Sequence, residues 1–69
     1  MTLEQIKAAV LNGQRVFWKT SSYEVKDTPG GWEIVCLFNG NCIGLTWTDG
    51  MTLNGKEKDF YIGPNFVAA

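Results

Sequence analysis

An uninterrupted apolar run at residues 34–38 constrains the fold of this chain more than any other feature. The run, Ile-Val-Cys-Leu-Phe, is followed directly by Asn39-Gly40. Asn-Gly is typical of the two central positions of a type I′ hairpin turn, where both residues need positive φ. The sequence therefore predicts a hairpin with strands at 32–38 and 41–48. A two-residue loop would set the register Phe38 with Asn41, Cys36 with Ile43, Ile34 with Leu45 and Trp32 with Trp47.

The same run predicts that the first strand of this hairpin is covered on both faces. A strand with one face in water alternates apolar and polar residues, and residues 34–38 do not alternate. A single helix can cover only one face of a sheet. The other face is then closed either by curling of the sheet into a small SH3-like or OB-like barrel, or by a partner molecule, with a homodimer among the options.

The N-terminal residues predict that helix. Thr2 and Gln5 have the spacing of a capping box, in which each side chain accepts from the other residue's backbone N–H. Apolar residues recur at helical spacing after it, and Asn12-Gly13 supplies a left-handed exit. A helix over 3–12 has about three turns and is marginal alone, so we expect it to dock on the sheet.

Period-two patterns and turn-forming residues fill the rest of the chain. Further strands are predicted at 15–19, 23–26, 51–53 and 59–62, separated by turns at 20–22, 27–31, 48–50 and 54–55. The expected fold is α+β: one N-terminal helix packed on a strongly bent, antiparallel, five- or six-stranded meander. Residues 1–64 form the single domain, and 65–69 are a tail that adds an edge contact, docks on a neighbour or frays.

Composition excludes several functional classes. The chain has 69 residues, a formal net charge of −1 and no histidine. No block of like charge favours nucleic acid or a membrane surface. Glu4 stands where a signal peptide has a basic region, and no apolar run approaches the roughly 20 residues of a membrane span. We therefore expect a cytoplasmic protein with no membrane partner.

The two cysteines, Cys36 and Cys42, are expected to be small buried apolar residues. In the predicted register they point to opposite faces of the sheet, which excludes a disulfide. A one-residue slip to a three-residue loop would instead place them opposite each other. Without histidine, a catalytic thiol lacks its usual base and a zinc site lacks ligands.

No other pattern indicates catalysis, a metal or a cofactor. The acidic stretch that begins at Asp49 has Met51 where a calcium loop needs an oxygen ligand, so Asp49 is expected to form a turn. The glycines occur as turn pairs and form no phosphate-binding loop. We expect a protein that is not an enzyme.

The aromatic residues allow two kinds of binding. Phe17, Trp18 and Tyr23 lie near Arg15, Lys19 and Lys26 in the sequence, which is the composition of a stacking platform for single-stranded nucleic acid. The negative net charge makes that reading, and a small-ligand site, the alternative. Most rings are expected to build the core, and since Phe17 and Trp18 alternate, at most one of them faces it. The candidate contact residues for a protein partner are Phe17, Lys19, Tyr23, Glu24, Asp59 and Phe60.

The segment from Gly40 to Tyr61 resembles small accessory proteins of bacteriophages and prophages. The resemblance rests on Cys-Ile-Gly-Leu-Thr-Trp-Thr-Asp-Gly at 42–50 and Leu-Asn-Gly-Lys-Glu at 53–57. The opening helix, Leu-Glu-Gln-Ile-Lys at 3–7, is similar to the start of several such proteins. The resemblance implies a phage-encoded, non-enzymatic protein that binds and inhibits or adapts a host protein. The host proteins that such phage proteins bind include components of restriction and CRISPR defence systems. The resemblance assigns no site residue to this chain.

Overall fold

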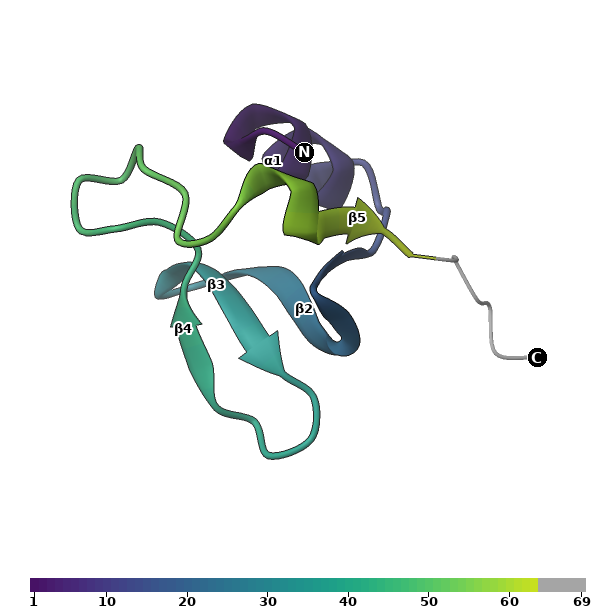
Figure 1. The fold of residues 1–69 in the computed structure, drawn as a ribbon. Coiled ribbons are helices and arrows are strands. Elements are labelled where there is room, and N and C mark those ends of the chain that lie inside the picture. Colours follow the sequence, from purple (N-terminus) through teal and green to yellow (C-terminus); the bar gives the residue numbers. More distant parts are fainter. Residues whose placement is uncertain (64–69) are drawn as a thin grey trace.

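The computed structural model describes residues 1–63, and the predicted tail at 65–69 lies outside the described residues. One helix lies against a five-stranded antiparallel sheet of order β4-β3-β2-β1-β5 (Figure 1). The elements are α1 (Leu3–Leu11), β1 (Val16–Trp18), β2 (Thr20–Thr28), β3 (Gly31–Cys36), β4 (Cys42–Gly44), the 3₁₀ helix η1 (Glu57–Asp59) and β5 (Phe60–Ile62).

The expected α+β arrangement is confirmed, and the sheet does not close into the small barrel that was one of the expected alternatives. β1 to β4 follow one another as a meander, whereas β5 returns to pair with β1 at the opposite edge. β4 and β5, the two edge strands, do not pair, so the sheet is open. A barrel requires the first and last strands of the order to hydrogen-bond with each other.

α1 begins and ends where the sequence predicts, within one residue. The Gln5 N–H donates to Thr2 Oγ1 at 3.2 Å, and the Thr2 N–H donates to Gln5 Oε1 at 2.9 Å, which completes the capping box. Asn12 caps the C-terminus, and Gly13 leaves the helix with φ +86°. These local signals explain why the helix was predictable.

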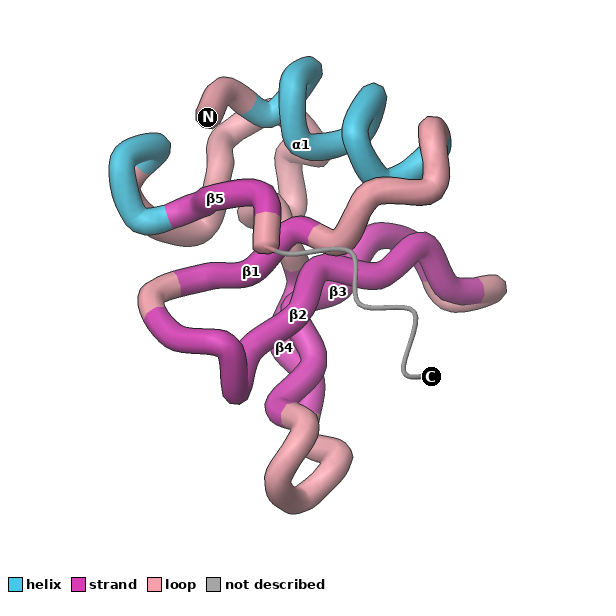
Figure 2. Tube along the Cα trace, turned by 90° about the vertical axis from the view of Figure 1, so that its right-hand side faces the viewer, coloured by secondary structure: helices cyan, strands magenta, loops and turns pink. Residues whose placement is uncertain are grey.

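The core lies between α1 and the sheet face that the helix covers (Figure 2). Its buried side chains come from the helix, from the three central strands, from β5 and from the segment after β4. Each such aliphatic side chain contributes about 1.5–3 kcal/mol by burial. The buried members are Ile6, Ala9, Val16, Val25, Ile34, Leu45 and Phe60.

The β3–β4 hairpin has a different register from the expected one. Ile34 pairs with Ile43, and the Cys36 N–H donates to Asn41 O at 2.7 Å, so the loop has four residues, 37–40. Within this loop only Gly40 has positive φ, whereas a type I′ turn needs two such residues. The chain closes instead by a bond from the Gly40 N–H to Cys36 O at 2.8 Å.

The shift of two residues preserves the face of every side chain. Cys36 and Cys42 therefore point to opposite faces, and both are free. Cys36 is half-buried, but Cys42 is exposed because β4 is an edge strand, so the expectation that both are buried is wrong for Cys42.

Burial also divides the apolar run at 34–38. Ile34 is 1% exposed, and the next two residues are half-buried. Leu37 and Phe38 lie in the hairpin loop, where they are 45% and 89% exposed. The expectation that the whole run is covered on both faces is therefore wrong, because the strand ends at Cys36.

Two further local expectations are wrong. The predicted turn at 20–22 belongs to β2, because the chain reverses at Lys19, which has φ +62°, and an irregularity between Phe17 and Trp18 absorbs the extra residues. The predicted strand at 51–53 is reduced to one bridge between Leu53 and Thr46. Within residues 1–63, no helix is long and apolar enough to cross a membrane.

Candidate protein-interaction surface

The predicted contact residues lie in different environments. Phe17, Glu24 and Phe60 are 4%, 9% and 3% exposed, so their side chains offer little surface to a partner. Lys19 is exposed, whereas Tyr23 and Asp59 are half-buried. The six residues do not form one accessible surface.

Phe17 is buried although it lies on the sheet face away from α1. Its ring stands beneath the Arg15 guanidinium, whose carbon is 5.0 Å from the ring centroid, and beside the Tyr61 ring at 5.9 Å. Gly63 closes the third side, since a Cβ built there would lie 2.0 Å from the Phe17 ring. Alternation correctly placed Phe17 and Trp18 on opposite faces, but it did not predict this cover by Arg15, Tyr61 and Gly63.

Arg15 and Glu24 form an ion pair over the same face. Arg15 Nε and Nη2 donate to the two Glu24 carboxylate oxygens at 3.1 and 2.9 Å. The hydrogen bond from Arg15 lowers the pKa of Glu24, although partial burial opposes that shift. The pair was not predicted, because it depends on the alignment of β1 with β2, where Phe17 lies opposite Glu24.

The basic and aromatic residues of the alternative nucleic-acid reading are divided between the two faces. Lys19 Nζ lies 4.6 Å from the Trp18 ring, and Tyr23 meets that ring edge-on at 5.5 Å, on the core side of the sheet. Arg15 lies over Phe17 on the opposite side, where Glu24 neutralises it. These residues therefore form no single cationic stacking platform.

Among the large apolar residues that the structure describes, Phe38, in the β3–β4 hairpin loop, has the highest exposed fraction, 89%. Leu37 precedes it in the loop, and Ile43 lies on β4 opposite Ile34, with exposures of 45% and 47%. We call Leu37, Phe38 and Ile43 the tip surface. The hairpin projects away from α1 and the rest of the sheet in both views (Figures 1 and 2).

Hydrogen bonds brace the tip surface. The Leu37 N–H donates to Ser22 O on β2 at 2.7 Å, and the Asn41 N–H donates to Asn39 Oδ1 at 2.9 Å. No residue from 34 to 48 carries a charge. The centres of protein interfaces are likewise depleted of charged residues and enriched in aromatic ones. The braced hairpin therefore presents an apolar surface with little desolvation cost.

A second exposed apolar pair lies on the loop after β4. Trp47 and Met51 are 63% and 79% exposed. Asp49 shapes this loop as predicted, because its Oδ1 accepts the N–H groups of Met51 and Thr52 at 2.8 and 2.9 Å. The Thr52 hydroxyl donates to Asp49 Oδ2 at 2.6 Å, and this bond together with the two backbone bonds lowers the pKa of Asp49. The loop adds apolar area but no free ionisable group.

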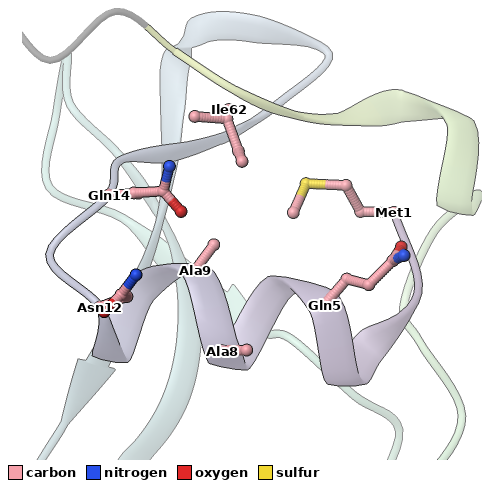
Figure 3. A pocket seen from close by; sticks show the side chains of 7 residues that line it. All are labelled: Met1, Gln5, Ala8, Ala9, Asn12, Gln14 and Ile62. Atoms are coloured by element: carbon pink, nitrogen blue, oxygen red, sulfur yellow. The ribbon is translucent and has the colours of Figure 1, made fainter.

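An open groove of about 460 Å³ separates α1 from β5 (Figure 3). Small side chains at Ala8 and Ala9 leave it hollow, and Ile62 forms part of the opposite wall. The polar side chains that line it are amides. The remaining lining residues are Met1, Gln5, Asn12 and Gln14.

Metal ligands are likewise dispersed: within residues 1–63, no group of three or more His, Cys, Asp and Glu side chains is placed to hold an ion. The sequence did not predict the tip surface, because it assigned Leu37 and Phe38 to a strand. A four-residue loop around Asn39-Gly40 would have exposed both.

Comparisons with protein-family models, curated proteins and solved structures give no match for this chain. The relationship to bacteriophage accessory proteins stays a prediction.

Proposed function

We propose that this chain is a non-enzymatic protein-interaction module that binds its partner through the tip surface. The observation that carries the proposal is Phe38, 89% exposed at the end of a braced and uncharged hairpin. Exposed apolar patches on small domains mark interaction sites, and aromatic anchors supply most of the binding energy at such sites.

The geometry favours insertion of Phe38 into an apolar pocket of the partner. Leu37 and Ile43 would then pack around the pocket and exclude water from the contact. The bonds that hold Leu37 to Ser22 and Gly40 to Cys36 fix the hairpin before binding. A fixed loop loses less conformational entropy on association than a free one.

We further propose that the partner is a bacterial protein and that the chain inhibits or adapts it, as the resemblance to phage accessory proteins implies. A restriction or CRISPR component is the kind of target that this resemblance favours. Binding by occlusion needs no catalytic group, which agrees with the amide-lined groove and the dispersed acids of the described residues.

Quantitative capture tests the tip surface. The full chain, immobilised, is exposed to lysate of a bacterial host, and the retained proteins are compared for wild type, Phe38→Ser and Leu11→Ser. Leu11 is the matched control, because it is 71% exposed on α1, away from the hairpin. Loss of an aromatic anchor costs about 2 kcal/mol or more, which is roughly a 30-fold loss of affinity.

We expect Phe38→Ser to lose the specific partner and Leu11→Ser to retain it. Both positions are exposed, so both variants should unfold at about the wild-type temperature. Equal capture by wild type and Phe38→Ser would refute the tip surface as the binding site.

A further inference from the structure

We propose that Asn39-Gly40, at the tip of the β3–β4 hairpin, is a self-modification site where the folded chain favours succinimide formation and deamidation. Asn39 is exposed, and its Oδ1 accepts the Asn41 N–H at 2.9 Å. This bond holds the side-chain carbonyl next to the peptide that follows it. Gly40 has no side chain, and a Cβ built there would meet nothing within 4 Å, so access to the peptide nitrogen is open.

The reaction needs only water as a co-reactant. The Gly40 backbone nitrogen loses its proton to solvent base and bonds to Asn39 Cγ, and the Cγ–Nδ2 bond breaks to release ammonia. Water then opens the cyclic imide at either carbonyl, which gives aspartate or isoaspartate. The Asn41 N–H points at the oxygen on which negative charge develops, and a donor placed there stabilises the transition state.

One bond must open first. The Gly40 N–H donates to Cys36 O at 2.8 Å, and the nitrogen can attack only when this contact is broken. The loop is exposed and belongs to an edge hairpin, so the opening leaves the core between α1 and the sheet intact.

The other two Asn-Gly pairs are held differently. Asn12 closes the end of α1, where its N–H donates to Ala8 O and Ala9 O, and the Gly13 N–H donates to Val10 O. Release of the Gly13 nitrogen therefore breaks one of the bonds that close the end of α1.

Asn54 is half-buried and bonded through both its side chain and its backbone. Its Nδ2 donates to Gly44 O at 3.1 Å, and its N–H donates to Leu45 O at 2.8 Å. The following residue, Gly55, is crowded by Trp18, because a Cβ there would lie 2.8 Å from Trp18 Nε1. The Asn54 amide is thus tied to Gly44, and this bond must break before the Asn54 side chain can turn toward the Gly55 nitrogen.

Deamidation would put a negative charge one residue from Phe38, and isoaspartate would add a backbone atom to the four-residue loop. On the proposed function, both changes weaken docking of the tip surface, since a charge at the centre of an interface is costly to desolvate. The modification itself does not depend on that function.

The test follows the full chain by peptide mass spectrometry during incubation at mildly alkaline pH, with isoaspartate quantified at each site. A parallel incubation in denaturant gives the reference, because all three sites share the Asn-Gly sequence. We expect similar rates at Asn12, Asn39 and Asn54 in denaturant, and at least severalfold faster conversion at Asn39 than at the other two in the folded chain. Folded rates in the same ratio as the denatured rates would overturn the proposal.

Two variants separate this site from the proposed function. Asn39→Gln should remove the early conversion and leave the other two sites unchanged, and persistence of the early conversion would overturn the assignment to Asn39. Asn39→Asp should lose capture of the partner that wild type retains. Full capture by Asn39→Asp would refute the effect on docking, while the mass readout would still decide the modification site.

Discussion

Replacing Leu45 by alanine tests whether the irregular segment after β4 is part of the core. Leu45 lies outside the regular strands, yet it is 0% exposed. Its N–H donates to Trp32 O at 3.0 Å, and its carbonyl accepts the Asn54 N–H at 2.8 Å, so the backbone is fixed on both sides. Because this backbone cannot move inward, the truncation should leave a cavity rather than a repacked core.

The expected cost follows from that rigidity. Leu→Ala substitutions at closed core sites cost about 2–5 kcal/mol. A chain of 69 residues at about 0.05–0.15 kcal/mol per residue has a total stability of roughly 3–10 kcal/mol. Leu45→Ala should therefore remove about a fifth of the stability or more, and should lower the melting temperature by at least about 8 °C.

Chemical denaturation followed by far-ultraviolet circular dichroism measures this loss. Leu11→Ala is the matched control, since Leu11 is 71% exposed and alanine is at least as good a helix former. We expect the control to change stability by no more than about 0.5 kcal/mol. If Leu45→Ala and Leu11→Ala had the same midpoint, the segment after β4 would not belong to the core.

Two further predictions concern ionisable groups. The hydrogen bond from Arg15 holds the pKa of Glu24 below its ordinary 4.5, so this carboxylate stabilises the fold above that pH, and the contribution is lost as the pH falls through the lowered pKa. Thermal melts between about pH 7 and 3 should fall less steeply for Glu24→Gln than for wild type, and equal slopes would contradict the pair. Similarly, hydrogen bonding with the neighbouring Glu33 carboxylate raises the pKa of the Cys42 thiol. In a Cys36→Ser background, Glu33→Gln should speed alkylation of Cys42 by iodoacetamide near pH 8, and an unchanged rate would show that the contact is absent.

Local signals predicted the helix and the side-chain faces. The Thr2–Gln5 capping box depends on residues three apart, so the sequence alone locates it. The face of each β3 residue was also correct, because a register error of two residues leaves the alternation unchanged. Both predictions depend only on residues that lie close together in the sequence, so no contact between distant segments is needed to make them.

Contacts between distant segments account for the failures. Phe17 and Phe60 are buried because β5 returns to β1, a pairing that period-two patterns do not specify. The position of the turn around Asn39-Gly40 depends on the bond between Leu37 and Ser22 as well as on the turn residues. The observed turn position places Phe38 in the exposed hairpin loop and not in the strand that the sequence predicted.

Photo-crosslinking at residue 38 tests the role of the tip surface most directly. Phe38 is replaced by p-benzoylphenylalanine, which keeps an aromatic ring in place, and the chain is irradiated in living bacteria. As a control, a second variant carries the same group at residue 11. A discrete covalent adduct from residue 38 that is missing from residue 11 is the expected result. Identical adducts from both positions, or none from residue 38, would contradict a partner seated on the hairpin.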